Sequence, residues 1–451
     1  MAFTTIPGSG AAATTIVGTS GVDFGSITSI DNYFVGAQQG GDTIGVTSNL
    51  SNGTMKGGQG NDTVSFTAGA SLTSSWLNAN SNADTIGNAA GNANFFASTV
   101  QGGQGNDTFQ IGTVEETLVN GNKNNDSIAS VTTATATLYG GQGNDTLNST
   151  ATASSTVSGD LADDQITIGG GNQTSSTFNG GDGNDSVSIN ASTAATNTFT
   201  SNTINGGAGN DNITTAGGAR ALSAGTVVNG DAGIDNINLA AFTQVITING
   251  GDDGDVITSG TAADVVDGGA GNDTITNTNA ATSNDTITGG TGADSITTSA
   301  LGTTEQINQK AGDSIAATGG MTNLTGAGLI ANGATTVTFA NGVDIITAAI
   351  TATDFLATGI AGTATAANNG VMDTAVGGSF AMDFRAATAG NYLIRGTYTL
   401  GTGVFLVANG GADMLFIQTN GGDLTAAANV GTSSMILVGS GGVTTNADLI
   451  V

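Results

Sequence analysis

The chain of 451 residues contains 74 Gly, 35 acidic residues, six basic residues, and neither Cys nor His. The missing residue types exclude thiol chemistry, Ser-His-Asp and Cys-His nucleophilic catalysis and the usual zinc sites, which leaves hard cations bound by oxygen ligands. A formal net charge of −29 argues against nucleic acid and anionic lipid as partners, because both require a surface rich in Lys and Arg. The sequence contains no run of about 18 apolar residues, so it predicts no membrane-spanning segment.

Residues 1–35 are rich in Gly, Ala and Thr, with spaced apolar residues that include Phe3, Ile6, Ile16 and Phe24. The segment contains no Lys or Arg and no continuous apolar stretch, so it does not predict a cleaved secretory signal. We expect an N-terminal cap, or an arm that pairs with another molecule in an assembly.

Residues 36–318 are dominated by an internal repeat. The hexapeptide Gly57–Asp62 reads Gly-Gly-Gln-Gly-Asn-Asp, and nine such segments or near-copies occur. An apolar residue lies two positions before the first Gly and another seven positions after it, as at Met55 and Val64. Apolar and polar residues alternate on the flanks, which is the period of a strand with one buried face. The repeat therefore predicts a unit of strand, tight turn and strand.

Weaker turns fill the gaps between the good copies. They keep the ending Asp-x-Ile, or Asp-x-Val at Asp264, while the Gly positions change to Asn, Ala or Ser. They end at Asp42, Asp84, Asp126, Asp164, Asp264, Asp285 and Asp313. Strong and weak turns together step by about 20 residues as far as Asp255, which predicts one coil of a stacked structure for each step. Beyond Asp255 the step falls to about half, so we expect both edges of the coil to carry a turn of this kind there.

Each strong turn combines backbone freedom with a carboxylate. Consecutive Gly residues permit positive φ and expose carbonyl oxygens, and the Asp carboxylate completes an oxygen cage suited to calcium. One turn cannot supply six ligands, but two turns stacked about 4.8 Å apart can. We predict multiple calcium ions with carboxylate ligands from Asp62, Asp107, Asp145, Asp185, Asp211, Asp235, Asp255, Asp273 and Asp294. The predicted glycine ligands, which act through carbonyls, begin the same repeats at Gly57, Gly102, Gly140, Gly180, Gly206, Gly230, Gly250, Gly268 and Gly289.

Other interpretations of the acidic turns are open. The Asp residues could cap uncharged turns by hydrogen bonding to the backbone. Adjacent acids such as Asp163 and Asp164, or Asp252 and Asp253, could form a glycosidase pair, which requires two carboxyls about 5–10 Å apart across a sugar. Trp76 and the sparse aromatic residues predict no sugar-binding platform. An acidic loop without a following Gly-Lys-Ser/Thr does not predict a phosphate site.

Residues 319–451 differ from the repeats. The Asp-rich turns thin out, and the segment becomes rich in Ala and Thr with spaced aromatic residues, among them Phe339, Phe355, Phe380, Phe384, Tyr392, Tyr398, Phe405 and Phe416. This composition predicts a β-rich C-terminal domain. Because the end of a stacked β-structure is an open sheet edge, we expect the domain to act as a cap or as an assembly domain.

The nine-residue pattern Gly-Gly-x-Gly-x-Asp-x-aliphatic-x resembles that of the hemolysin-type calcium-binding, or repeats-in-toxin (RTX), proteins. The resemblance covers roughly residues 36–318. It implies an all-β fold, namely a right-handed parallel β-roll or β-solenoid with calcium ions between stacked turns. The family's densest arrays repeat without pause, whereas insertions lengthen many coils here. The ending Asp448-Leu449-Ile450-Val451 resembles the uncleaved carboxy-terminal signal of RTX proteins exported by type I secretion.

These observations predict a secreted, non-enzymatic structural protein that folds on binding calcium outside the cell and self-assembles at the bacterial cell surface. In this respect the chain resembles calcium-dependent bacterial surface-layer and sheath proteins, and the expected product is a layer, sheath or filament. The expected partners are further copies of the chain and the type I secretion machinery, with cell-surface polysaccharide as a further candidate. The second candidate is a monomeric secreted adhesin or biofilm-matrix protein, and the third is a carbohydrate-active enzyme.

Overall fold

The structure is a computed structural model. It describes residues 4–6, 14–27, 30–87, 93–190, 197–216, 225–277, 284–298, 306–308, 319–322, 336–339, 344–347, 355–357, 370–372, 390–399, 402–408, 411–419, 426, 435–438 and 449–450. These residues form strands, bridges, turns and bends, and no helix that could cross a membrane occurs among them. The chain divides into two compact units, Met1–Ala232 (unit 1) and Gly233–Val451 (unit 2).

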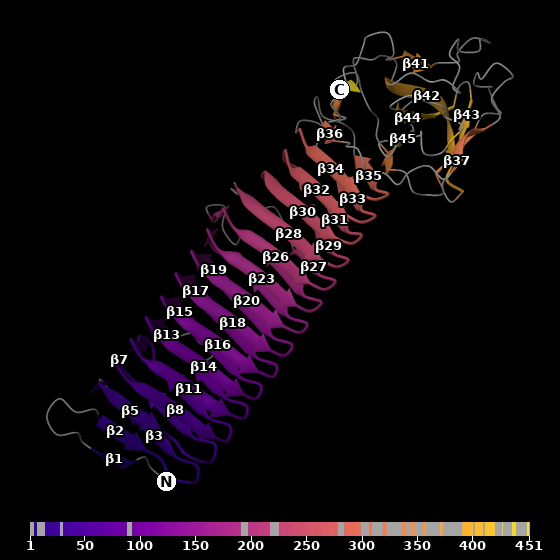
Figure 1. Cartoon of the computed structure of the whole chain (residues 1–451). Coiled ribbons are helices and arrows are strands. Elements are labelled where there is room, and N and C mark those ends of the chain that lie inside the picture. Colours follow the sequence, from indigo (N-terminus) through magenta and orange to yellow (C-terminus); the bar gives the residue numbers. More distant parts are fainter. Residues whose placement is uncertain are drawn as a thin grey trace. The chain divides into compact units, whose positions relative to one another are not determined.

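Unit 1 consists of two parallel sheets in which each coil of the chain contributes to both (Figure 1). Sheet 1 contains β2 (Thr14–Val17), β5 (Tyr33–Gly36), β8 (Thr54–Gln59), β11 (Trp76–Ser81), β14 (Thr99–Gln104), β16 (Leu118–Lys123), β18 (Thr137–Gln142), β20 (Thr156–Leu161), β23 (Thr177–Asp182), β26 (Thr203–Ala208) and β28 (Thr226–Ala232). An additional strand, β1 (Thr4–Ile6), pairs antiparallel with β2.

Sheet 2 of unit 1 is built from shorter strands, some of them two to a coil. They are β3 (Phe24–Ile27), β4 (Ile30–Asp31), β6 (Thr43–Val46), β7 (Leu50–Ser51), β9 (Thr63–Phe66), β10 (Ser71–Thr73), β12 (Thr85–Gly87), β13 (Ala93–Phe96), β15 (Thr108–Glu115), β17 (Ser127–Ala134), β19 (Thr146–Ala153), β21 (Gln165–Ile168), β22 (Gln173–Thr174), β24 (Ser186–Asn190), β25 (Phe199–Thr200) and β27 (Asn212–Ala216).

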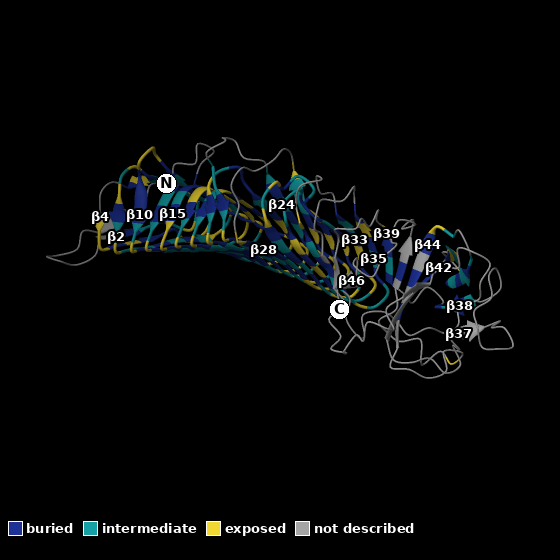
Figure 2. Cartoon of the chain, turned by 90° about the horizontal axis from the view of Figure 1, so that it is seen from above, coloured by how far each residue is buried: buried dark blue, intermediate teal, exposed yellow. Residues whose placement is uncertain are grey.

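One coil shows the pattern that the others follow. The chain runs through β18, passes the glycine-rich turn that ends at Asp145, continues through β19, and reverses at Ser154 and Ser155 into β20. The turn with the Asp defines the Asp edge of the coil, and the reversal defines the Ser edge. Leu138 and Leu147, the apolar pair predicted to face inward, are fully buried. Buried residues alternate with more exposed ones along the strands, so the expected period of two is confirmed (Figure 2).

Unit 2 begins with the same kind of stacking. One parallel sheet contains β30 (Ile246–Asp252), β32 (Val265–Ala270), β34 (Thr286–Thr291), β36 (Gln306–Asn308), β40 (Phe355–Ala357) and β46 (Leu449–Ile450). The other contains β29 (Asn236–Asn238), β31 (Val256–Thr258), β33 (Thr274–Asn277), β35 (Ser295–Thr298) and β39 (Asp344–Thr347).

Beyond β39 the second sheet of unit 2 changes to mainly antiparallel pairing. β39 pairs with β45 (Met435–Val438), and the order continues through β44 (Asp413–Thr419), β42 (Gly390–Thr399), β43 (Val404–Val407), β38 (Thr336–Thr338) and β37 (Gly319–Thr322), with β41 (Gly370–Met372) beside β42. The predicted β-rich C-terminal region thus extends a solenoid sheet.

Parallel stacking reaches beyond the range 36–318 expected from the repeats. At the N-terminal side β2 and β3 already pair in parallel with β5 and β6, and at the C-terminal side β39 and β40 still stack on β35 and β36. The fold is therefore an all-β parallel β-solenoid, as the sequence predicts. The weak turn expected at Asp313 lies outside the described residues, as do Asp448 and Val451 of the predicted export signal.

Candidate metal centre

The acidic turns of successive coils form a single file of carboxylates in each unit, which we call the Asp column. In unit 1 the backbone N–H of each column Asp donates to Oδ1 of the Asp in the following coil, over 2.6–2.8 Å. The unit 1 column consists of Asp23, Asp42, Asp62, Asp84, Asp107, Asp126, Asp145, Asp164, Asp185 and Asp211. In unit 2 the same bond, over 2.8–2.9 Å, links Asp235, Asp255, Asp273, Asp294 and Asp344. All of these side chains are at most 3% exposed.

The second carboxylate oxygen, Oδ2, is buried without a hydrogen-bond partner at most of these positions. Among the described residues this holds for Asp42, Asp62, Asp84, Asp107, Asp126, Asp145, Asp164, Asp185, Asp255 and Asp273. A buried ionised oxygen that no donor or cation neutralises costs several kcal/mol. The repeated occurrence of such an atom therefore indicates a row of binding positions for a cation.

The first Gly of each repeat provides the space that Oδ2 occupies. A Cβ added to Gly57 would lie 2.6 Å from Asp62 Oδ2 and 2.5 Å from the carbonyl oxygen of Ala79 in the next coil. A Cβ on Gly140 would collide with Asp145 Oδ2 and would lie 2.7 Å from the carbonyl oxygen of Gly159. Any side chain here would fill this position, so Gly leaves a small cradle lined by carboxylate and carbonyl oxygens.

The second and fourth residues of the repeat, which are Gly in the strong copies, have the positive φ that the sequence predicts. Gly141 and Gly143 have φ of 114° and 123°. In the weaker turns that end at Asp84, Asp126 and Asp164 the equivalent residues are Asn, Asp or Ala and have the same sign of φ, as at Asn122 (80°) and Asn124 (73°). In the turn that ends at Asp42, Gly40 (101°) has this conformation and Gln38 does not. Asn and Asp tolerate this region better than other side chains. The weak turns therefore fold like the strong ones, and Asp42, Asp84, Asp126 and Asp164 stand in the same column.

Burial raises the pKa of the column carboxyls from Asp62 to Asp211 in unit 1, and of Asp255 and Asp273 in unit 2, well above the ordinary Asp value of 3.8. The pKa rises to about 6 at Asp62, Asp107 and Asp145, where a hydrogen bond from the preceding Asp N–H partly offsets the effect of burial. It rises to about 8 at Asp84 and Asp126, where burial is again the largest cause and the carboxylates on both sides add repulsion. Without a cation, the column is thus a costly place for negative charge near neutral pH.

At the Ser edge of unit 1, backbone N–H groups also donate to side-chain oxygens of the following coil, but these oxygens are uncharged. There the N–H that precedes β8, β11, β14, β18, β20 or β23 donates to a side-chain oxygen of the following coil, over 3.1–3.3 Å. The acceptors form the Ser column, which consists of Ser75, Ser98, Thr117, Ser155, Ser176 and Asn202. Its hydroxyls also donate to a carbonyl two residues earlier. The capping interpretation of the acidic turns therefore explains Oδ1 but leaves Oδ2 unexplained.

The donor set of the Asp column matches calcium. Among the described residues no group of three or more His, Cys, Asp or Glu side chains could hold a metal ion. A cage at the column must therefore combine carboxylates of neighbouring coils with backbone carbonyls, and calcium accepts such a set of six to eight oxygens. The buried Oδ2 atoms, the glycine cradle and the all-oxygen chemistry fit this ion. All nine predicted Asp ligands lie in the two columns, and the predicted Gly ligands line the cradle, as at Gly57 and Gly140.

Two column members escaped the sequence interpretation. Asp23 lies 19 residues before Asp42, an interval that could have revealed it. Asp344 carries the ending Asp-x-Ile, but it follows Asp294 only after 50 residues, which hides the period.

Asp264 and Asp285 lie on the other edge of unit 2, as the halved step beyond Asp255 predicts. Here both carboxylate oxygens have protein donors. Asp264 accepts the N–H groups of Ile246 and Gly260, each over 3.0 Å, and Asp285 accepts the Asp264 N–H and Asn277 Nδ2. The position agrees with the expectation, but these two acids do not show the unsatisfied oxygen of the Asp column.

The adjacent acids considered as a glycosidase pair do not face one space. Asp164 is buried in the column, whereas Asp163 is exposed and accepts a hydrogen bond from the N–H of Asn184, over 2.8 Å. Asp252 and Asp253 are both exposed at the turn before Asp255.

Comparison with a family model agrees with this geometry. Residues 137–151, 198–220, 247–276 and 280–300 match the RTX calcium-binding nonapeptide repeat. A solved structure of a hyperactive, Ca²⁺-dependent, β-helical antifreeze protein from an Antarctic bacterium is similar with 20% identity and a TM-score of 0.36, over 62% of this chain and 84% of that one. No curated protein matches.

The fold and the repeats together define a calcium-binding parallel β-solenoid. Four segments of the chain carry the RTX calcium-binding nonapeptide repeat, so the resemblance inferred from the nonapeptides is confirmed.

Proposed function

We propose that this chain is a secreted structural protein that folds on binding calcium outside the cell and self-assembles into a surface layer, sheath or filament. The observation that carries the proposal is the column of buried Oδ2 atoms whose charge a bound calcium ion would neutralise. At the low calcium level of a cytosol the carboxylates repel one another. At millimolar calcium the binding free energy becomes folding free energy, because the cages exist only in the folded chain.

An edge strand in unit 1 supports the assembly part of the proposal. Among the described strands β3 pairs with β6 on one side only, and Phe24 in β3 is 61% exposed. A sheet edge with an exposed aromatic residue and no charged side chain in the strand is a template for pairing with another chain. We propose that a second copy occupies it.

Electron microscopy of the purified protein with calcium and with a chelator tests the assembly. We expect a lattice or fibre in millimolar calcium that disappears on chelation. The variant Phe24→Lys should prevent it by placing a charge on the edge, whereas Val131→Lys, at a 51% exposed site in β17, which pairs on both sides, should not. A folded protein that stays monomeric in millimolar calcium would contradict assembly.

A monomeric secreted adhesin or matrix protein is the second candidate. It is favoured by the antiparallel strands β42–β45 of unit 2, which continue a solenoid sheet beyond β39 and so cover the edge that a further copy would otherwise meet. Sedimentation in millimolar calcium separates the two candidates, because only the first predicts large species. We propose no catalytic role for either.

A further inference from the structure

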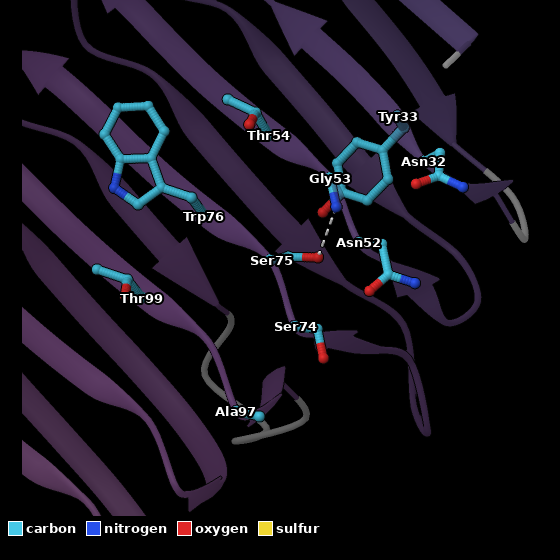
Figure 3. Close-up of a pocket in the computed structure, with 10 residues that line it drawn as sticks. All are labelled: Asn32, Tyr33, Asn52, Gly53, Thr54, Ser74, Ser75, Trp76, Ala97 and Thr99. Atoms are coloured by element: carbon cyan, nitrogen blue, oxygen red, sulfur yellow. Dashed lines mark hydrogen bonds between the residues drawn. The ribbon is translucent and has the colours of Figure 1, made fainter. Parts of the chain in front are cut away.

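A groove of about 580 Å³ runs along the Ser edge of unit 1, near its N-terminal end (Figure 3). Successive coils contribute to it in register, so its length follows the stacking direction of the solenoid. Its lining comes from Asn32 and Tyr33, from Asn52, Gly53 and Thr54, from Ser74, Ser75 and Trp76, and from Ala97 and Thr99.

Local sequence explains why the groove exists. Asn32, Asn52, Ser74 and Ala97 occupy the corner of the Ser edge in four successive coils, each with φ between 47° and 53°, and this corner exposes their side chains. Gly53 stands where the following coil has Ser75. A Cβ at this glycine would collide with the ring of Tyr33, so the missing side chain lets the buried ring pack onto the backbone. The result is an aromatic floor beneath a row of small polar side chains.

Trp76, the single Trp of the chain, forms one wall and is held in one orientation. Its Nε1 donates to Gln101 Oε1 over 3.2 Å, and Asn78 Nδ2 donates to the same oxygen over 3.2 Å. The Lys56 ammonium lies 5.3 Å from the centre of the ring, which is a cation–π contact. A ring fixed in advance loses little entropy when a ligand stacks on it.

A second aromatic residue lies on the same outward row of sheet 1. Phe34 pairs in register with Thr54, and Thr54 pairs with Trp76, so the two rings lie two strands apart. Two strand spacings amount to about 10 Å, a distance over which two linked pyranose rings extend. Phe34 is 36% exposed.

The groups around these rings are mostly uncharged hydrogen-bonding groups. Asn32, Asn52 and Ser74 are exposed at the rim, and Thr54 and Thr99 are partly exposed beside Trp76. Asn52 Nδ2 donates to Asp31 Oδ1 over 2.7 Å, so the Asn52 amide oxygen is the group that can accept a hydrogen bond from a ligand. Aromatic surface combined with amides and hydroxyls matches the apolar faces and hydroxyl rims of neutral sugars.

We propose that this groove binds a linear, neutral polysaccharide, with Trp76 and Phe34 against successive sugar units and with Asn52, Thr54 and Thr99 bonding to its hydroxyls. The sequence does not reveal the platform, because its members come from separate coils. The proposal does not depend on assembly, since a monomer would bind in the same way.

Electrophoresis of the full chain through native gels with millimolar calcium tests the proposal. The gels contain hydroxyethyl cellulose, laminarin, dextran or, as the acidic comparison, alginate. We expect retardation by at least one neutral polymer. Trp76→Ala should weaken it by about tenfold, as for the loss of one aromatic contact, and Phe34→Ser by less.

The matched control is Tyr139→Ser, which removes an aromatic residue from sheet 1 outside the groove. It should leave the retardation unchanged, and circular dichroism in calcium should show all three variants folded. Retardation by none of the neutral polymers, by alginate alone, or equally in Trp76→Ala and Tyr139→Ser would overturn the proposal.

Discussion

The two edges of unit 1 perform the same backbone task with different chemistry. At the Ser edge, the N–H of Ala136 donates to the uncharged Ser155 Oγ over 3.1 Å. At the Asp edge, the N–H of Asp126 donates to a carboxylate, Asp145 Oδ1, over 2.6 Å. Since a hydroxyl suffices to cap a coil, capping alone does not account for a row of acids. The carboxylate brings an additional oxygen and a charge, and both are useful only if a cation is bound.

Unit 2 sharpens the same contrast. Asp264 and Asp285 are buried acids too, yet Gly260 N–H and Asn277 Nδ2 donate to their second oxygens. A buried carboxylate alone therefore does not mark a calcium ligand in this fold. The mark is a carboxylate whose Oδ2 faces a glycine and carbonyl oxygens instead of donors.

Chelation of calcium should give the largest effect, because it removes the ligand of the whole Asp edge at once. In excess EDTA at neutral pH we expect most of the β-sheet signal in far-UV circular dichroism to be lost, and to return on addition of calcium. If the spectrum and melting temperature are the same with and without EDTA, the conclusion that the Asp edge binds calcium is contradicted.

Acid should partly replace calcium in the metal-free protein. Folding raises the pKa of column carboxyls such as Asp62, Asp84 and Asp126 to about 6–8 from 3.8, so their protonated form stabilises the folded state. That stabilisation is complete below pH 3.8 and is lost as the pH rises through 6–8. In EDTA the β-sheet signal should therefore increase from pH 7 to pH 5. In saturating calcium the sign should reverse, since protons compete with the ion. An EDTA titration in which acid unfolds the chain would contradict this assignment.

Asp145→Asn should separate charge from capping, because the amide oxygen can still accept the Asp126 N–H. In calcium we expect a loss of about 2–4 kcal/mol in the free energy of unfolding, since a ligand is removed. In EDTA near neutral pH, where the chain is marginal, the same variant should be more stable than the parent, since a repelling charge is removed. Ser155→Ala is the control for the other edge and should cost about 1 kcal/mol in both conditions. Equal effects of Asp145→Asn with and without calcium would contradict the charge argument.

Gly140→Ala probes the cradle. Its Cβ would collide with Asp145 Oδ2, so we expect a loss of about 1–3 kcal/mol together with weaker calcium binding by titration calorimetry. Gly21→Ala, where an added Cβ meets nothing within 4 Å, is the matched control and should change neither quantity. Unaltered calcium affinity in Gly140→Ala would place the ion elsewhere.

Asn122→Ala should give the smallest effect. Its φ of 80° disfavours Ala by about 1 kcal/mol, whereas Asn122→Gly should be neutral or slightly stabilising. Thermal unfolding in calcium measures both variants. An Ala variant as stable as the Gly variant would indicate that the weak turns do not need this conformation.

The repeat made the Asp edge predictable from the sequence, because each strong turn holds Gly and Asp at fixed positions. The inward apolar pairs, such as Leu138 and Leu147, follow from the same spacing. The Ser edge was not predictable, since Ser and Thr are common throughout the chain. The insertions also vary the number of residues between each column Asp and the next reversal of the chain. Asp344 and the groove at Trp76 depend on residues that distant coils bring together, which no local pattern records.

The hydrogen bonds of the Asp column all point one way along unit 1. Asp126 relies on Asp145 for an acceptor, and Asp145 relies on Asp164. The Ser edge has the same direction, from Ser155 to Ser176. The residue after each column Asp donates the other way, as where the N–H of Ser127 donates to the carbonyl oxygen of Asp107 in the preceding coil, over 2.8 Å. Each coil thus donates amides to both of its neighbours at the Asp edge, so shortening unit 1 from either side should release one such amide of the new terminal coil to water.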